Sequence, residues 1–184
     1  FDRRLRNGKI DDAVGIAHEG GEFCVAVVFV RGGRNLGSSN YFPRGGLGDE
    51  GEMLAGFLAQ YYLAREAPSE IVLSRTVEGA EALEQALAQK AGHTVEIRTN
   101  VRGTRARWIE MARNNAALGL KMRASSRATV ADQLDAVGRE LSLGKTPQRI
   151  ECFDVSHSMG ESAVASCVVL GPEGPLKSDY RRFN

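Results

Sequence analysis

The stretch "DAVGIAHEGGEFCVAVVFVRGGRNLGSSNYF", residues 12–42, holds three segments of strand character separated by two pairs of glycines. These segments are residues 12–18, 23–31 and 34–42. Each is rich in alternating or β-branched residues, and the pairs Gly20-Gly21 and Gly32-Gly33 favour tight hairpin turns between them. The sequence therefore predicts a meander of three antiparallel strands.

Helices and strands alternate after this meander. Asp49 suits the N-cap of a helix through "EMLAGFLAQYYLARE". The further predicted elements are a strand at 70–74, a helix at 77–92, a strand at 93–100, helices at 104–126 and 128–143, and a linker at 144–148. This order predicts an α/β fold whose mixed sheet carries helices on its faces. The ribonuclease H fold has the same order, although a fold alone does not define a function.

Composition restricts the class of protein. The 184 residues are 42% hydrophobic and 26% charged with a net charge of +1, which is ordinary for a globular protein and gives no global case for nucleic-acid binding. No apolar run approaches the roughly 18 residues of a membrane span. Cys24, Cys152 and Cys167 lie in apolar stretches without metal-type spacing, so we expect buried, reduced thiols in a cytoplasmic protein. The abrupt aromatic and basic ends lead us to expect a fragment.

The opening meander has a second copy 139 residues later. Nine of thirty positions are identical between residues 12–41 and 151–180, where ordinary composition gives roughly two. In this alignment Asp154 falls opposite Gly15, so one copy carries a carboxylate that the other lacks. Asp154 stands in an apolar run, where an ionised carboxylate is costly unless it is paired or binds a metal. We therefore favour a functional role for Asp154 over a structural one.

The same alignment argues against a catalytic His157. His157 follows Asp154 by three residues, but His18 occupies the matching position in the copy that lacks the acid. A shared structural role near the first hairpin is the better interpretation. Glu161 and Glu22 match in the same way and receive the same interpretation.

Longer stretches carry a family resemblance. "RIECFDVSHSMGESAVASCVV" and "GPLKSDYRRFN" (149–169 and 174–184) resemble the start of the endonuclease domain of UvrC, a family of bacterial excision nuclease components. "YFPRG", "PSEIVL" and "VRGTRARWIEMARNNA" resemble the central part of the same family with looser identity. The resemblance covers most of the chain.

The resemblance implies a ribonuclease H-like domain that cuts DNA on the 5′ side of a lesion during nucleotide excision repair. It implies Mg²⁺ or Mn²⁺ as cofactor, with Asp154 as a catalytic residue and metal ligand; the family's remaining acids and its histidine lie beyond the matching segment. DNA and the excision nuclease component UvrB are the implied partners, the latter bound through other parts of the family's proteins. One carboxylate holds magnesium weakly, so we expect the chain alone to be inactive.

These observations predict two domains. Residues 1–147 would form a catalytically silent ribonuclease H-like domain and its linker, and 148–184 the opening three-stranded meander of a second such domain. An isolated meander leaves an apolar face, including some of Phe153, Val155, Val164, Val168 and Leu170, in water. We therefore expect something to cover it, and we favour a second copy of the chain over the helices of the first domain.

Basic residues near Trp108 suggest contact with DNA. The candidates are Arg102, Arg105, Arg107, Arg113, Lys121, Arg181 and Arg182. An equally good interpretation makes Trp108, Ile109, Ala112 and Ala116 a core stripe and the arginines a solvated face. Alternation along a strand sends Arg181 and Arg182 to opposite faces, so at most one of them can meet the substrate.

Two other functions remain open. The first is a non-catalytic scaffold module that binds DNA or a repair partner, a role that is compatible with a silent domain. The second, an unrelated α/β metabolic enzyme, is disfavoured because the sequence has no glycine-rich phosphate loop, nucleophile elbow or zinc spacing.

Overall fold

The computed structural model describes residues 10–44, 49–156 and 164–183. The chain divides into two compact units, and the division falls between Lys121 and Met122. Helix α3 (Thr104–Glu140) runs through this boundary, and each unit is described by itself. Among the described residues, no helix has the length and apolar character needed to cross a bilayer.

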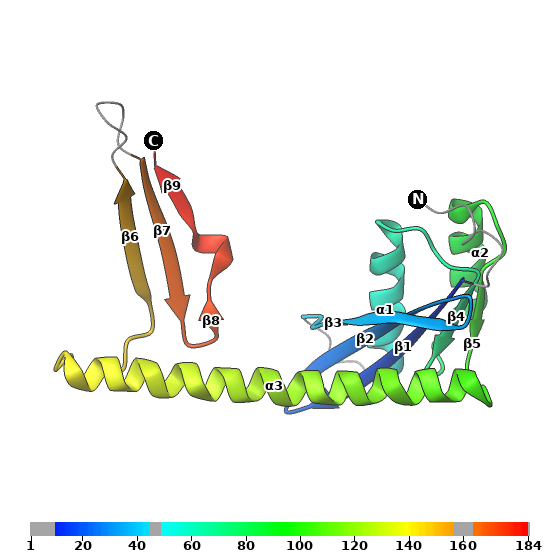
Figure 1. Cartoon of the computed structure of the whole chain (residues 1–184), viewed down its shortest axis with the longest axis horizontal. Coiled ribbons are helices and arrows are strands. Elements are labelled where there is room, and N and C mark those ends of the chain that lie inside the picture. Colours follow the sequence, from blue (N-terminus) through cyan, green and yellow to red (C-terminus); the bar gives the residue numbers. More distant parts are fainter. Residues whose placement is uncertain (1–9, 45–48, 157–163, 184) are drawn as a thin grey trace. The chain divides into compact units, whose positions relative to one another are not determined.

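The first unit is built on a five-stranded mixed sheet of order β3-β2-β1-β4-β5 (Figure 1). Its elements are β1 (Ile10–Glu19), β2 (Glu22–Arg31), β3 (Arg34–Tyr41), α1 (Glu50–Leu63), β4 (Glu70–Leu73), α2 (Ala80–Ala91), β5 (Glu96–Arg98) and the first part of α3. The first three strands pair antiparallel, whereas β4 runs parallel to β1 and β5 parallel to β4. The predicted meander and mixed sheet are confirmed, and the topology is ribonuclease H-like.

Local sequence signals form these elements as expected. Gly20 and Gly21 have φ of +59° and +78°, and Gly32 and Gly33 have +56° and +75°, which are left-handed conformations that glycine adopts without steric cost. Asp49 caps α1, its Oδ1 accepting hydrogen bonds from the backbone N–H groups of Gly51 (2.7 Å) and Glu52 (2.9 Å).

Helices cover both faces of the first sheet because both faces are apolar. Even-numbered residues of β1 and odd-numbered residues of β2, such as Val14 and Val25, belong to a core shared with α1 and α2. On the opposite face Ala13 and Val28 pack against Ala112 of α3. The sheet is thus buried between α1 and α2 on one side and the start of α3 on the other.

The predicted break between two helices at residues 126–128 is wrong. Residues 104–140 form one helix of 37 residues, visible as an uninterrupted coil in Figure 1. Within the helix, the Thr129 hydroxyl donates to the Ser125 carbonyl (3.0 Å), four residues back. Between Gly119 and Gly138 the sequence contains neither glycine nor proline to end it.

The second unit contains a smaller antiparallel sheet that follows the end of α3. Its elements are β6 (Ile150–Ser156), β7 (Val164–Gly171), β8 (Gly174–Pro175), the 3-10 helix η2 (Lys177–Asp179) and β9 (Arg181–Phe183). β7 pairs with β6 on one side and with both β8 and β9 on the other. The predicted third strand is thus interrupted by η2, in contrast to the continuous β3.

The predicted equivalence of the two meanders fails by one residue. Gly15 of β1 pairs with Ala26, and the alignment equates these with Asp154 and Ala165. Asp154 pairs instead with Ser166. A shift of one residue turns the second strand over, so the ungapped alignment does not describe equivalent positions in both hairpins. His157 and Glu161, whose roles rested on this alignment, lie outside the described residues.

The cysteine prediction holds for two residues of three. All three cysteines are free thiols, and Cys24 and Cys167 are buried. Cys152 is exposed, because neither face of β6 is covered by the described part of the chain.

Candidate functional site

Asp154 lies in the middle of β6 and is exposed, so the expectation of a carboxylate in a buried run is wrong for this chain. Phe153 and Val155, its neighbours, are 57% and 55% exposed. β6 is an outer strand of the second sheet, and only β7 lies beside it. Asp154 therefore carries no burial penalty here and is accessible to a ligand.

The strand register divides the second sheet into two different faces. One face, which we call the aromatic face, carries the pairs Phe153–Cys167 and Val155–Ala165 together with Phe183. The rings of Phe153 and Phe183 lie 6.4 Å apart. The other, the Asp154 face, carries Asp154, Ser156, Ser166 and Arg182 towards the β6–β7 hairpin and Cys152, Val168 and Leu170 at its other end.

Asp154, Ser166 and Arg182 form one row across this face. Asp154 pairs with Ser166, and Ser166 pairs with Arg182 on the next strand. All three are exposed, and within the described chain none of them has a hydrogen bond or ion pair from its side chain. Arg181 points to the aromatic face, where its Nη1 donates to the carbonyls of Ser178 (2.9 Å) and Tyr180 (2.8 Å).

The described residues do not make up a metal centre. A group of three or more His, Cys, Asp or Glu side chains placed to hold an ion is absent from residues 10–44, 49–156 and 164–183. The Asp154 carboxylate can supply one oxygen ligand, whereas Mg²⁺ takes six ligands in octahedral geometry. No step of a reaction can be assigned through a metal from these residues alone.

Helix α3 covers Gly15, the position that the sequence alignment set opposite Asp154. A Cβ at residue 15 would lie 2.5 Å from the backbone C of Ala112 and from the backbone N of Arg113. Real Cβ contacts are never that short, and backbone atoms of a packed helix cannot move aside cheaply. A carboxylate side chain at residue 15 is therefore incompatible with the observed packing of α3 on β1.

Beside β1, a cavity of about 380 Å³ opens at the edge of α3. Its lining includes His18, Arg75, Glu110, Arg113 and Asn114. Glu50, also in the lining, pairs with Arg75 through a 2.7 Å contact. The charges of this cavity are mixed, so it shows no preference for a phosphate group.

Arg105 binds a buried acid rather than solvent. Glu70, at the start of β4, is fully buried, and its carboxylate forms an ion pair with Arg105 Nε and accepts a 3.0 Å hydrogen bond from Arg105 Nη2. Asp11, the neighbour of Glu70 across the β1–β4 pair, is 4% exposed. The hydrogen bond to Glu70 raises the pKa of the Arg105 guanidinium. Arg105 thus fastens α3 to the sheet.

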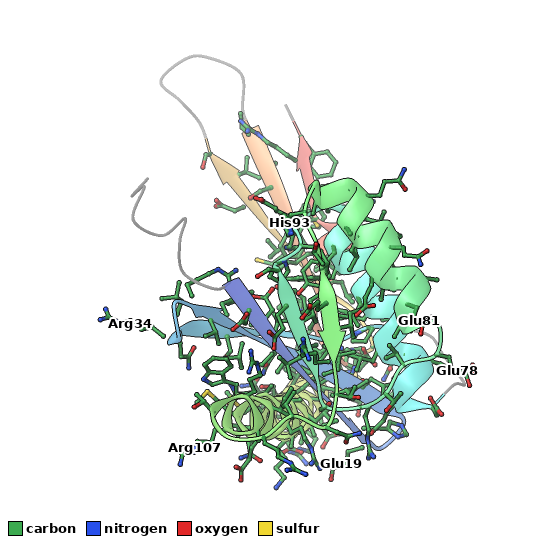
Figure 2. The ribbon with its side chains drawn as sticks, turned by 90° about the vertical axis from the view of Figure 1, so that its right-hand side faces the viewer. Glu19, Arg34, Glu78, Glu81, His93 and Arg107 are labelled. Atoms are coloured by element: carbon green, nitrogen blue, oxygen red, sulfur yellow. The ribbon has the colours of Figure 1, made fainter. Side chains whose placement is uncertain are left out.

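The remaining basic candidates of the first unit are exposed. Arg102, Arg107, Arg113 and Lys121 have no side-chain hydrogen bond or ion pair to the described residues. Arg107 points away from α3 (Figure 2). Trp108, Ile109, Ala112 and Ala116 pack on the sheet. The predicted core stripe is thus confirmed. Contact with DNA remains a prediction for these four residues.

Ser166 was missed by the sequence analysis. Its position in the Asp154 row depends on the β6–β7 register, and the ungapped repeat placed Ala165 there instead. The β7–β9 register assigns Arg181 and Arg182, which the sequence left equivalent, to the aromatic face and the Asp154 face respectively.

The strand order and pairing of the first unit define a ribonuclease H-like protein. The family described as "UvrC Ribonuclease H-like domain" matches residues 11–123, and that described as "UvrC RNAse H endonuclease domain" matches residues 138–184. The chain belongs to the UvrC family.

Curated relatives support this assignment. UvrABC system protein C of Pseudomonas aeruginosa (strain LESB58) is 50% identical over 182 residues, which cover 97% of this chain and 30% of the relative. The protein of the same name from Alkalilimnicola ehrlichii is 48% identical over 174 residues, covering 94% of this chain and 28% of the relative. The chain thus spans about 30% of the length of these relatives.

Proposed function

We propose that this chain is part of a nuclease component of nucleotide excision repair, whose endonuclease domain hydrolyses a phosphodiester on the 5′ side of a lesion. Asp154 is the catalytic residue that the chain contributes, as one ligand of a Mg²⁺ or Mn²⁺ ion. DNA is the substrate, and UvrB is the partner through other parts of the protein.

One observation carries this proposal: an unpaired, exposed carboxylate stands in mid-strand on a sheet whose residues match an endonuclease family. A mid-strand position holds a carboxylate rigidly, as a shared metal ligand requires. A bound metal would supply an activated water and stabilise the leaving oxygen. The protein's own part is to hold that carboxylate and the DNA backbone beside it.

A chimera tests the proposal. This chain replaces the 182 residues that align with it in UvrABC system protein C of Pseudomonas aeruginosa. With its partner proteins, lesion-containing duplex and Mg²⁺, the chimera is expected to cut on the 5′ side, and Asp154→Ala to lower that rate at least 100-fold. A 5′ cut that survives Asp154→Ala, or a folded chimera that never cuts, would contradict the proposal.

The 184-residue chain by itself is expected to leave the same DNA uncut, because the described residues offer no complete ligand set. Metal-dependent cutting by this chain that disappears in Asp154→Ala would show that the site is complete after all.

A second function, DNA binding by the first unit without catalysis, is favoured by the unpaired arginines along α3. Arg107→Gln and Arg113→Gln should then weaken duplex binding at low salt. Each should also lower the slope of log affinity against log salt by about 1, as expected for the loss of one phosphate contact. Arg102→Gln and Lys121→Gln extend the same test. Arg105→Gln is the contrasting variant, because loss of the Glu70 ion pair should lower stability rather than remove a DNA contact.

A further inference from the structure

We propose that Ser166 and Arg182 form, beside Asp154, a contact for one phosphodiester group of the DNA strand, and that the neighbouring Arg181 takes no part in it. This inference rests on the proposed function, since it names the DNA-binding residues of the same site.

The strand pairing places Asp154, Ser166 and Arg182 side by side. Asp154, Ser166 and Arg182 occupy adjacent positions on β6, β7 and β9, in a row perpendicular to the strands. Antiparallel partners lie about 4.5–5.5 Å apart, so the Cα atoms of Asp154 and Arg182 are about 10 Å apart with Ser166 between them. Within the described chain no ion pair joins Asp154 and Arg182, although an extended arginine side chain could span that separation.

The chemistry of the row fits a phosphodiester group. A phosphate lying over Ser166 meets a hydroxyl donor beneath it and a guanidinium on one side, which are the groups that bind phosphate oxygens in DNA complexes. The acid stands on the other side of Ser166, where the reacting bond would lie under the proposed function. A carboxylate alone would repel the strand, and Arg182 is the nearest cation in the row to offset it.

Arg182 and Arg181 differ in whether their guanidinium groups already have hydrogen-bond partners in the described chain. The Arg182 side chain is exposed without a partner in the described chain, so binding breaks no existing contact. Arg181 holds the carbonyls of Ser178 and Tyr180 and faces Cys167 on the aromatic side. Two adjacent arginines of equal charge therefore have opposite expected roles.

The test measures equilibrium binding of a fluorescent DNA duplex to the 184-residue chain at several salt concentrations, without divalent metal. Arg182→Gln is expected to weaken binding about five- to tenfold and to lower the slope of log affinity against log salt by about 1. Ser166→Ala is expected to weaken it about two- to fivefold, in keeping with the loss of one hydrogen bond. The charge-matched controls Arg181→Gln and Lys177→Gln should stay within about twofold of the parent chain.

A fourth variant tests the position of Asp154. Asp154→Asn removes the carboxylate charge and, without metal, should tighten binding about twofold, since a like charge near the phosphate is lost. Equal losses in Arg182→Gln and Arg181→Gln, no loss in Arg182→Gln, or no measurable DNA binding by the parent chain at low salt would each overturn the inference. Because none of these measurements uses cutting, their failure is distinguishable from failure of the proposed function, which the Asp154→Ala chimera tests.

Discussion

Gly15 shows how the close seating of a helix can exclude any side chain from a strand position. The backbone of α3 passes so close that a Cβ there would lie 2.5 Å from Ala112 and Arg113 backbone atoms. We predict that Gly15→Ala destabilises the first unit by about 1–3 kcal/mol through overpacking, and that Gly15→Asp costs more because a buried charge is added. Urea unfolding followed by the fluorescence of Trp108, which packs in the same layer, measures both.

Gly56→Ala is the matched control for that experiment. Gly56 lies on α1, and a Cβ there meets nothing within 4 Å. Alanine at an exposed helical position should stabilise the chain by about 0.5–1 kcal/mol. If Gly15→Ala behaved like Gly56→Ala, the close seating of α3 on β1 would be wrong.

Tyr62 and Asp12 give a pH-dependent prediction. The Tyr62 hydroxyl, 1% exposed as a residue, donates to Asp12 Oδ2 (2.8 Å), and Arg31 Nη1 donates to Asp12 Oδ1 (2.9 Å). Burial, and then the Asp12 charge, raises the pKa of Tyr62 well above its usual 10.0. The unfolded chain therefore loses this proton first, and the stabilisation is complete below about pH 10 and is lost as pH rises further.

Tyr62→Phe should cost about 1–2 kcal/mol at pH 7 and flatten the decline in stability above pH 10. The free energy of unfolding at pH 7, 10 and 11 provides the measurement, with Tyr180→Phe as the control because Tyr180 is 37% exposed. An unchanged slope above pH 10 in Tyr62→Phe would assign that loss to other groups.

Individual residues were predicted from sequence where their role depends on local structure. The glycine pairs of the first meander and the Asp49 cap could be predicted because turns and caps are set by neighbours in the chain. The exposure of Asp154 and the partner of Arg105 could not, because both depend on what packs against them from distant segments. The acid of that pair, Glu70, gave only a weak signal as a charge opening an apolar strand.

The continuity of α3 gives a prediction about a single element. Residues 122–130 lie inside the helix, so Ser126→Pro should remove a backbone hydrogen bond and cost about 3 kcal/mol of helix stability. NMR Cα chemical shifts of the parent chain should be helical without a break from 122 to 130, and those preceding residue 126 should become coil-like in the variant. Coil values at 125–128 in the parent chain would restore the two predicted helices at 104–126 and 128–143.

The β6–β7 register can be tested through the cysteines. Cys152 pairs with Val168 in the structure, whereas the ungapped repeat would set it opposite Cys167. Under oxidation the parent chain should therefore form no Cys152–Cys167 disulfide within a molecule, and Val168→Cys should form one with Cys152. Trypsin leaves residues 150–177 as one peptide, so the bond is located by mass spectrometry after cleavage at Glu161, with Val168→Cys made in a Cys167→Ser background. A Cys152–Cys167 bond in the parent chain would favour the repeat register and remove Arg182 from the Asp154 row.

This register could not be obtained from sequence similarity alone. Hairpin pairing depends on the geometry of the connecting turn, and identity between two strands does not reveal that they pair with a register shifted by one residue. The Gly20-Gly21 turn has only two residues between paired positions 19 and 22, whereas seven separate the paired Ser156 and Val164. The two hairpins thus differ where the alignment assumed they agree.

The two sheets differ in how far they are covered, and the difference bears on self-association. Both faces of the first sheet are buried by helices, whereas Phe153, Val155 and Phe183 on the aromatic face are 50–57% exposed. Burying apolar area stabilises a protein by roughly 25 cal/mol for each Å², and the exposed part of this face lacks that stabilisation. We therefore retain the proposal that a second copy of the chain covers this face in solution.

Light scattering over a range of concentrations tests this association. Phe153→Ser and Phe183→Ser should shift the chain towards monomer, because each removes an exposed ring from the aromatic face. Leu36→Ser, a loss of a 62% exposed apolar residue on β3, should leave the association unchanged. If the parent chain stays monomeric at all concentrations while Phe153 and Phe183 remain ordered by NMR, a second copy is not needed to hold this sheet together. The pairing within β6, β7 and β9 would then be sufficient by itself, against the expectation that three strands without cover are marginal.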